Sequence, residues 1–332
     1  MANDQRNVVA LGDFDPYRSG TGQQPSGNGA SLDLGHIVAE LRNVREQWRG
    51  AQKRPREVGG RELPSREALT GIVDGLRGAL FPMRLGPPDL RQESEDYYVG
   101  HTLDAVLTAL LLQVRLELRY HARHGGPADA DTRALEVVRD FGAALPQIRS
   151  LLDSDVLAAF HGDPAARSVD EVLLCYPGIH AMIHHRIAHR LYVLGVPLLA
   201  RLVAELAHGT TGIDIHPGAT IGPGFFIDHG TGVVIGETAE IGNNVRLYQA
   251  VTLGAKRFAT DDDGHLQKGG ARHPIVEDDV VIYAGATILG RVTIGRGSTI
   301  GGNVWLTRSV PPGSRIAQAS TRDDTVVGTA GI

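Results

Sequence analysis

Cysteine is almost absent from this sequence, which has one cysteine, Cys175, in 332 residues. A single cysteine excludes an internal disulfide bond and any metal site built from several cysteines. Cys175 follows the apolar run Val172-Leu173-Leu174, and a thiol in such surroundings is usually buried and unreactive. We therefore predict a buried structural thiol here and not a nucleophile.

The sequence also lacks dense runs of lysine and arginine, and its formal net charge is −5. Proteins that bind nucleic acids usually carry a clustered excess of positive charge, so nucleic acid is not an expected partner. No uninterrupted apolar run reaches the roughly 18 residues of a membrane span, and the start, Met1-Ala-Asn-Asp-Gln-Arg, lacks the apolar core of a signal peptide. We expect a soluble, cytoplasmic protein without a membrane partner.

Hydrophobic residues nevertheless make up 42% of the chain. This content is enough for a substantial core, and the length allows about two domains. The first segment is rich in Gly, Ser, Gln and Asn, a composition that buries too little apolar surface to offset chain entropy. We predict a disordered tail over 1–30, an α-helical domain over 31–210, a β-helix over 211–312 and a C-terminal tail over 313–332.

The helical domain is predicted from apolar residues that recur on one face of several segments. Ser65 is suited to be an N-cap, and Ser168 opens a capping-box sequence. Pro177 suits the first turn of the helix that follows. The wide apolar surface of the longest segment predicts an interior or assembly helix. The expected helices lie near 37–48, 69–80, 97–122, 131–141, 146–160, 177–194 and 197–207.

Four histidines of this domain, His180, His184, His185 and His189, form two pairs with i,i+4 spacing. Such spacing occurs in helical zinc sites, but no His-Glu-x-x-His arrangement is present and neighbouring arginines would repel a cation. We therefore predict structural or interface roles for these histidines.

Bulky aliphatic residues return every six residues between Ile215 and Val310. Neither the helical period of about 3.6 nor simple strand alternation gives this period, whereas a triangular coil with one hexad per side does. We therefore predict a parallel β-helix with these side chains inward and a second inward position four residues further on. The first set comprises Ile215, Ile221, Ile227, Ile235, Ile241, Leu247, Leu253, Val276, Ile282, Ile288, Ile294, Ile300 and Leu306. The second comprises Ala219, Phe225, Thr231, Ala239, Val245, Val251, Val280, Ala286, Val292, Ser298, Val304 and Val310.

Two departures from this rhythm mark a candidate site. Two extra residues follow Asp228-His229, and a long excursion runs from 254 to 273. Insertions in repeat proteins project from one face and often hold function. Asp214 and His229 are 15 residues apart, slightly less than one coil, so we expect them near the same corner. A carboxylate on one imidazole nitrogen leaves the other free to accept a hydroxyl proton.

The motifs at these positions resemble the signature of the serine acetyltransferases, hexapeptide-repeat enzymes that acetylate the serine hydroxyl from acetyl-CoA. The resemblance covers about 160–312 and implies a left-handed β-helix under an N-terminal helical domain that assists assembly and supplies part of the acceptor site. It also implies a homotrimer, or a hexamer as a dimer of trimers, and the first step of cysteine biosynthesis. The matching segments are Asp163-Pro-Ala, Pro177-Gly-Ile-His180, Asp214-Ile-His-Pro, Asp228-His229, Val234-Ile-Gly-Glu-Thr238, Val251-Thr-Leu-Gly254 and Arg272-His273-Pro274.

By this resemblance His229 matches the general base and Asp214 its orienting partner, the assignment that base-plus-orienter logic also favours. The resemblance implies that Asp163 and Asp228 hold the amino group of serine. It further implies that Arg272 and His273 hold the carboxylate, where a guanidinium forms charge-assisted bonds. Acetyl transfer would then be direct, with no covalent acyl-enzyme and no metal.

The same resemblance implies that the pantetheine arm of acetyl-CoA runs near Gly254, Ala255 and Ala284. Ala255 stands where the family has a second glycine, and Tyr283 stands where a glycine is usual. These departures concern the acetyl-CoA groove and the acceptor preference.

Three alternatives stay open at this point. A gamma-class carbonic anhydrase would use a similar β-helix with His216, His229 and His273 as zinc ligands. A second alternative is a binding module without activity. A third is transfer to another hydroxyl amino acid such as homoserine.

The chain ends in Gly331-Ile332. In many serine acetyltransferases a terminal isoleucine on a tail enters the active site of the sulfhydrylase that uses O-acetylserine. An apolar side chain beside a free carboxylate imitates an amino-acid ligand. The resemblance therefore implies this sulfhydrylase as a partner through Ile332.

Overall fold

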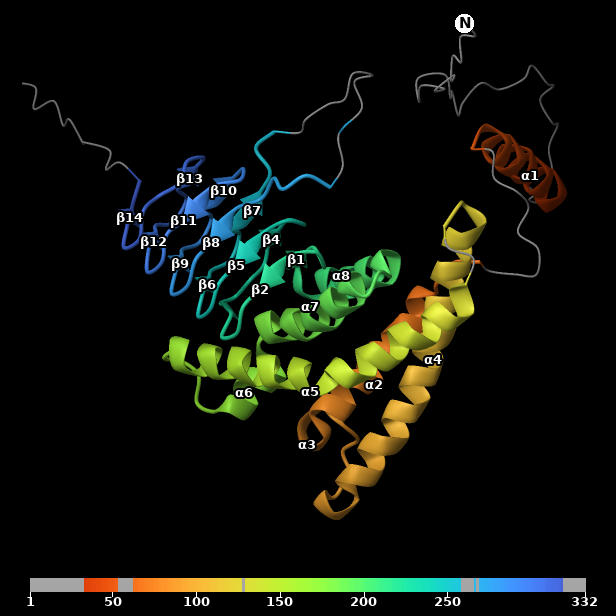
Figure 1. Ribbon diagram of the computed structural model, residues 1–332, viewed down its shortest axis with the longest axis horizontal. Coiled ribbons are helices and arrows are strands. Elements are labelled where there is room, and N and C mark those ends of the chain that lie inside the picture. Colours follow the sequence, from red (N-terminus) through yellow and green to blue (C-terminus); the bar gives the residue numbers. More distant parts are fainter. Residues whose placement is uncertain (1–32, 53–61, 127–128, 258–265, 267–268, 319–332) are drawn as a thin grey trace, which may run out of the picture. The chain divides into compact units, whose positions relative to one another are not determined.

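The computed structural model describes residues 33–52, 62–126, 129–257, 266 and 269–318 (Figure 1). The tail predicted over 1–30, most of the excursion after Gly254 and the end of the chain with Ile332 lie outside the described residues.

The chain divides into two compact units, Met1–Arg61 and Glu62–Ile332. The division differs from the predicted domains, because the segment around 37–48 falls in the first unit. There it forms α1 (Leu34–Ala51), whose N-cap Asp33 accepts a hydrogen bond from the His36 amide at 3.0 Å. None of the residues of α1 is buried.

The described part of the second unit begins with a helical bundle. The predicted helix starts are confirmed. Ser65 accepts a hydrogen bond from the Ala68 amide, Ser168 accepts one from the Glu171 amide, and Pro177 occupies the first turn of its helix. The elements are α2 (Arg66–Leu80), α3 (Pro82–Leu85), η2 (Gln92–Ser94), α4 (Glu95–Arg123), α5 (Ala130–Gly162), α6 (Val169–Cys175), α7 (Pro177–Val193) and α8 (Pro197–Thr211).

Helix α5 corrects the prediction of two helices near 131–141 and 146–160. It is continuous over 33 residues with Pro146 in its interior. An interior proline costs roughly 3 kcal/mol in a helix, but here its ring is exposed while Phe141, Leu145 and Ile148 are buried in one stripe. Burial of the stripe on both sides of the proline outweighs the lost hydrogen bond.

Helix α4 packs on α2, α5 and α8. By length and composition alone, the stretch Gln92–Arg123 is long and apolar enough to cross a membrane, a pattern that the core helices of helical bundles share. A buried carboxylate interrupts it: Glu117 accepts hydrogen bonds from the amides of Leu198 and Leu199 at 2.9 and 2.8 Å. Glu117 therefore caps the first turn of α8 and locks the two helices together.

The chain then winds through three parallel sheets that form the faces of a triangular coil. The strand orders are β1-β4-β7-β10-β13 (sheet A), β2-β5-β8-β11 (sheet B) and β3-β6-β9-β12-β14 (sheet C). Their bounds are β1 (Asp214–Ile215), β2 (Thr220–Ile221), β3 (Phe226–Ile227), β4 (Val234–Ile235), β5 (Glu240–Ile241), β6 (Arg246–Leu247), β7 (Thr252–Gly254), β8 (Ile275–Val276), β9 (Val281–Ile282), β10 (Thr287–Leu289), β11 (Thr293–Ile294), β12 (Thr299–Ile300), β13 (Trp305–Leu306) and β14 (Arg315–Ile316). The predicted fold class, an α-helical domain followed by a left-handed parallel β-helix, is confirmed.

All thirteen members of the first inward set are buried, at 6% exposure or less. One member of the second set is wrong: Thr231 is exposed, and Val233 is fully buried in its place. The two extra residues after His229 shift the register, so Val233 is the residue that stands two positions before Ile235.

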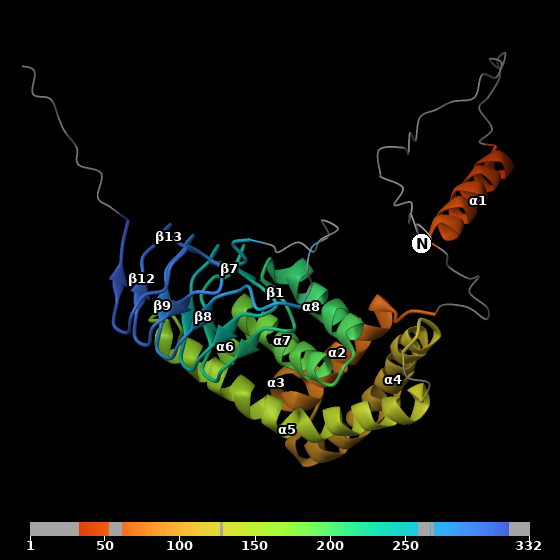
Figure 2. The same cartoon turned by 45° about the horizontal axis from the view of Figure 1, so that its top comes forward.

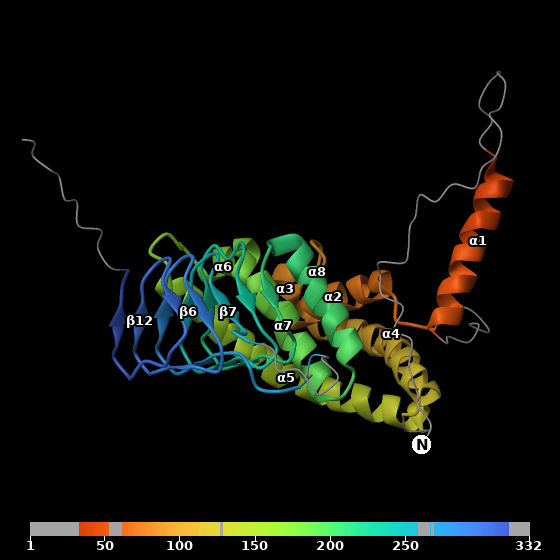
Figure 3. The same ribbon diagram turned by 90° about the horizontal axis from the view of Figure 1, so that it is seen from above.

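The helices meet the β-helix at its first coil, where α8 contacts β1 and both α5 and α7 contact β3 (Figures 2 and 3). A buried ion pair fixes this junction: Arg186 of α7 donates to both carboxylate oxygens of Asp155 in α5, at 3.0 and 3.1 Å. The same guanidinium donates to the carbonyls of Ile221 and Gly222, and Asp155 accepts from the Phe225 amide at 2.9 Å. The pair therefore ties two helices to the corner between β2 and β3.

The prediction of a buried Cys175 is wrong, because this residue is exposed. Helix α6 is short and buries only Val172 completely, while Leu174 is 55% exposed. The helix is about two turns long, and Cys175 is its last residue, exposed beside Leu174 at the end of the helix.

Candidate active site

Asp228 and His229 lie in the turn that follows β3, at the corner where sheet C passes into sheet A. His229 has a φ of 58°, in the left-handed region that side chains other than glycine seldom adopt. Its ring is 72% exposed and its Nε2 lies 3.8 Å from Oδ1 of the largely buried Asp228. Backbone strain of this kind often accompanies function.

Asp163 lies at the C-terminal end of α5, beside this corner. The Tyr176 hydroxyl donates to Asp163 Oδ2 at 2.6 Å, and the Ala165 amide donates to Oδ1 at 2.8 Å. These bonds hold the pKa of Asp163 below its usual value and raise the pKa of Tyr176 to about 12. Asp163 is therefore an ionised carboxylate at neutral pH.

Arg246 of β6 joins Asp163 and Asp228 into one site. Its Nη2 donates to Asp228 Oδ2 at 2.9 Å, and its Nη1 donates to the carbonyl of Gly162, next to Asp163, at 2.6 Å. The guanidinium also lies over the ring of Phe226, with 4.9 Å from Cζ to the centroid. Two carboxylates, Asp163 and Asp228, thus gather at one corner beside the exposed imidazole of His229.

Arg272 and His273 lie at a different corner, where sheet A passes into sheet B, just before β8. The amides of Arg272 and His273 both donate to the Thr238 hydroxyl, at 2.9 and 3.2 Å. Arg272 Nη2 donates to Glu237 Oε2 at 2.5 Å. The end of the long excursion therefore packs on the segment Gly236-Glu237-Thr238.

His273 is held as a neutral imidazole. Its Nδ1 accepts a hydrogen bond from the Thr238 amide at 3.0 Å, so the proton resides on Nε2. Burial and the neighbouring Arg272 lower the pKa of His273 to about 4. A Cβ at Gly236 would lie 2.1 Å from Nε2, so only glycine accommodates this ring. The group offers a neutral N–H donor beside a guanidinium.

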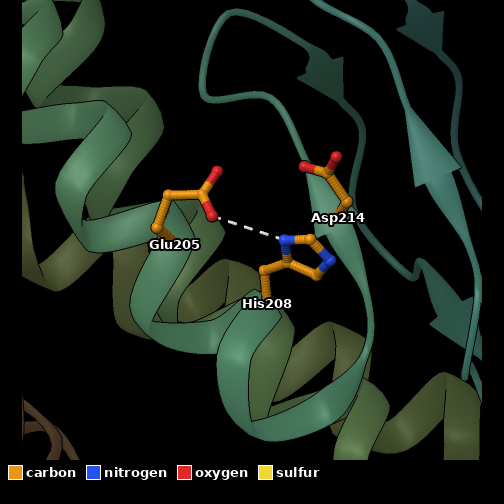
Figure 4. Close-up of side chains that lie close together, drawn as sticks. All are labelled: Glu205, His208 and Asp214. Carbon is orange, nitrogen blue, oxygen red and sulfur yellow. Dashed lines mark hydrogen bonds and ion pairs between the residues drawn. The ribbon is translucent and has the colours of Figure 1, made fainter. Parts of the chain in front are cut away.

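Asp214 begins β1, one coil before Val234, and shares the corner of His229. Within the described residues no hydrogen bond joins Asp214 to His229. Figure 4 instead shows Asp214 beside His208 and Glu205 of α8, and one ligand atom from each of the three lies within 4.8 Å of the others. This donor set has the composition of a metal site, but Glu205 already pairs with Arg201 at 3.2 Å and with His208 at 3.3 Å.

Of the residues assigned to the acetyl-CoA groove, Gly254 and Ala255 lie at the exit of β7. Leu289 of β10 pairs with Gly254, and Ala284 lies five residues before Leu289, at the entry to the same face. Within one chain Ala284 and the Gly254-Ala255 pair therefore lie at opposite ends of sheet A.

The structure thus separates the predicted site residues into two groups. Asp163, Asp228 and His229 share the corner between sheets C and A with Asp214, whereas Arg272 and His273 occupy the corner between sheets A and B. Six residues in extended conformation, the length of one side of the coil, span at most about 20 Å. In a single chain, one side of the coil lies between the two groups.

Sequence reasoning missed three residues that organise these groups, namely Tyr176, Tyr192 and Arg246. Tyr176 directly precedes the Pro177-Gly-Ile-His180 motif, so its position was a usable signal. Arg246 and Tyr192 carry no such signal, because their partners lie 18 and 45 residues away in sequence.

Comparisons with known proteins agree with these features. The chain matches the family described as bacterial transferase hexapeptide (six repeats) over residues 273–308. It is 61% identical over 275 residues to a protein of Synechococcus elongatus named "Serine acetyltransferase, plasmid", covering 81% of this chain and 86% of that protein. It is 50% identical over 166 residues to the serine acetyltransferase of Bacillus subtilis, covering 50% of this chain and 72% of that protein.

Two solved structures have a similar fold. Serine acetyltransferase 1 of Entamoeba histolytica in complex with L-cysteine matches with a TM-score of 0.65 and 33% identity, over 85% of this chain and 99% of that chain. The serine acetyltransferase of Neisseria gonorrhoeae in complex with serine matches with a TM-score of 0.50 and 31% identity, over 75% of this chain and 95% of that chain. With the relative that is 61% identical across most of both lengths, these matches show that the chain belongs to the serine acetyltransferase family.

Proposed function

We propose that this chain transfers the acetyl group of acetyl-CoA to the hydroxyl of L-serine, with His229 as the general base. The exposed imidazole of His229, 3.8 Å from Asp228 and at the same corner as the ionised Asp163, is the observation that carries the proposal. Two carboxylates attract the ammonium group of an amino acid and bring its hydroxyl within reach of the imidazole. His229 then removes the hydroxyl proton as the oxygen attacks the thioester, and returns it to the sulfur of the leaving CoA.

Arg272 and His273 are proposed to hold the carboxylate of serine. The guanidinium supplies charge and the neutral imidazole supplies its Nε2 proton, a pairing suited to one carboxylate. Asp214 is proposed to orient His229 once its side chain turns from His208 toward that ring, since both residues share one corner.

The separation of the two groups supports a homotrimer in which each acceptor site lies between two copies. In a trimer of triangular prisms the corner between sheets C and A of one copy faces a different corner of its neighbour. Each site would then combine His229 from one chain with Arg272 from the next. A hexamer formed by the helical domains of two trimers is the corresponding larger assembly.

Acetyl-CoA is proposed to lie along the edge between such copies. Gly254 and Ala255 of one chain and Ala284 of the next would line the pantetheine arm, which explains how residues at opposite ends of sheet A serve one groove.

Family membership favours acetyl transfer over the carbonic anhydrase alternative. A thiol-release assay with acetyl-CoA and serine tests the proposal, and the same assay with homoserine tests the acceptor. Release dependent on serine is the expected result. Zinc bound in proportion to protein, with carbon dioxide hydration in place of thiol release, would support the alternative instead.

We further propose a role in the first step of cysteine biosynthesis in the cytoplasm, with the O-acetylserine sulfhydrylase as a partner through Ile332. The support is the resemblance of Gly331-Ile332 to the isoleucine-bearing tails of the family. Capture of the sulfhydrylase by the full chain and by a chain lacking Ile332 is the test, and equal capture would refute the role of that residue.

A further inference from the structure

Tyr192 of α7 belongs to the helical bundle but reaches the corner that holds Arg272. Its hydroxyl donates to Glu237 Oε1 at 3.0 Å, while Arg272 Nη2 donates to the other oxygen, Oε2, at 2.5 Å. Glu237 is therefore clamped between a phenol from α7 and a guanidinium that arrives 35 residues later in sequence. The Tyr192 ring is itself fixed by an edge contact with His216, at 5.7 Å between centroids.

The charges in this chain of contacts are well defined. Burial acts to raise the pKa of Glu237, but the bonds from Arg272 and Tyr192 outweigh it and lower that pKa. Glu237 is therefore ionised, and its side chain is only 23% exposed. A largely buried carboxylate with both oxygens hydrogen-bonded is held in one orientation. It therefore fixes the position of the Arg272 guanidinium that binds it.

The guanidinium of Arg272 keeps donors for a ligand in this arrangement. Nη2 faces Glu237 and Nη1 donates to the Gly270 carbonyl at 3.2 Å, which leaves Nε–H and one further N–H on each terminal nitrogen. Glu237 thus positions the guanidinium of Arg272 and leaves three of its N–H donors free to bind a carboxylate.

We infer that Tyr192 is a positioning residue for the acceptor carboxylate, acting on Arg272 through Glu237. The inference rests on the proposed function, because it assigns Arg272 to the carboxylate of serine. It extends that function by making α7 part of the acceptor specificity of the site. Tyr192 touches no reacting atom, so its effect belongs in serine binding and not in the chemical step.

Tyr192→Phe removes one hydroxyl and keeps the ring against His216. We expect the KM for serine to rise about two- to tenfold, the range of one lost hydrogen bond, with kcat and the KM for acetyl-CoA unchanged. Tyr97→Phe is the matched control, because Tyr97 is 79% exposed on α4, and it should change none of these constants. An unchanged KM for serine in Tyr192→Phe would overturn the inference, as would an equal rise in both KM values.

A double-mutant cycle tests the route through Glu237. In a Glu237→Ala background, Tyr192→Phe should have no further effect on the KM for serine, because the group it acts through is gone. Additive effects would overturn the route. Thermal unfolding of each variant separates a folding defect, since a positioning role changes the KM while leaving the midpoint within the range of the Tyr97→Phe control.

Serinamide separates this inference from the proposed function. It has the hydroxyl and amino group of serine but no carboxylate, so Tyr192→Phe should change its KM far less than that of serine. If the wild-type chain acetylates serine but Arg272→Lys leaves the KM for serine unchanged, the proposed role of Arg272 fails. If Arg272→Lys raises that KM and Tyr192→Phe does not, only the inference about Tyr192 fails.

Discussion

His229 shows at the scale of one residue how position and chemistry coincide. A positive φ costs a residue with a side chain of the order of 1 kcal/mol or more. His229 has a φ of 58°, and the glycines at 230 and 232 also have positive φ. The turn leaves the imidazole exposed beside the carboxylate of Asp228. A base needs this access to substrate more than it needs burial.

We predict that His229→Ala lowers kcat by about 10²–10⁴-fold, the usual contribution of a general base. Its ring is largely exposed and belongs to neither inward set, so the oligomeric state and the unfolding midpoint should match the wild type. Steady-state kinetics and light scattering measure both. A kcat close to that of the wild type would exclude His229 as the base.

Arg272→Lys should raise the KM for serine far more than the KM for acetyl-CoA. Lysine keeps the charge but loses the planar fork that Glu237 orients. Kinetics with each substrate varied in turn is the measurement. Equal changes in both constants would indicate that Arg272 orders the end of the excursion and does not bind the carboxylate.

Among the elements, the packing of the helices on one another and on the β-helix depends on ionic groups that hydrophobic patterning does not reveal. Glu117 caps α8 from within α4, and Asp155 with Arg186 ties α5 and α7 to the first coil. Both are charges on otherwise apolar faces. Each would be costly to bury alone, so the partner across the interface determines whether the helices dock.

Asp155→Ala should lower the free energy of unfolding by about 3–5 kcal/mol, because Arg186 is left buried without its counter-ion. Asp153→Ala is the matched control in the same helix: its ion pair with Arg149 is 2.8 Å long but about half exposed. An exposed pair contributes roughly 0–1 kcal/mol. Denaturant titration at one protein concentration compares the two, and equal losses would contradict the assigned role of the buried pair.

His184 gives the helical bundle a dependence on pH. The residue is 4% exposed, and burial lowers its pKa from 6.5 to about 4. Between these values the unfolded chain binds a proton that the folded chain excludes, so stability falls as pH falls. For one group with these values, the loss between pH 7.5 and pH 5 is about 2 kcal/mol.

His184→Asn should reduce that loss, because asparagine does not titrate and its side-chain amide can replace Nδ1 as the donor to the His180 carbonyl, 2.8 Å away. His124→Asn is the control, since His124 makes the same 2.8 Å contact to the carbonyl four residues earlier but is exposed. Unfolding free energies at the two pH values are compared. If His184→Asn leaves the pH dependence of the unfolding free energy unaltered, that dependence arises from other groups.

At the scale of the whole molecule, the two groups of site residues on different corners predict that activity requires more than one copy. Mixtures of His229→Ala and Arg272→Ala chains should regain activity, because some interfaces then combine an intact His229 with an intact Arg272. Random mixing in a trimer restores about a quarter of the sites. Each variant alone should stay inactive.

The matched control mixes His229→Ala with Asp228→Ala, whose changes lie at one corner. Every site then keeps one defect, so no activity should return. Recovery in the control, or none in the first mixture after confirmed exchange of chains, would contradict a shared site.

The β-helix and most candidate site residues follow from local sequence patterns alone. A six-residue period is local and specifies which side chains point inward before any tertiary contact is known; all of Ile215 to Leu306 in that set are buried as predicted. Motifs such as Arg272-His273 are equally local. These features depend on neighbours in sequence, and sequence reasoning is strong there.

Which of these residues meet depends on contacts between segments that are distant in the sequence. The continuous α5 through Pro146, the exposure of Cys175 and the turn of Asp214 toward His208 each depend on a surface contributed by a distant segment. The same holds for the links from Tyr176 to Asp163 and from Tyr192 to Glu237. Helix propensity and hydrophobic period describe the structure that a segment prefers on its own. Burial and long-range hydrogen bonds contribute free energies of similar size to propensity, and they determine where the side chains point.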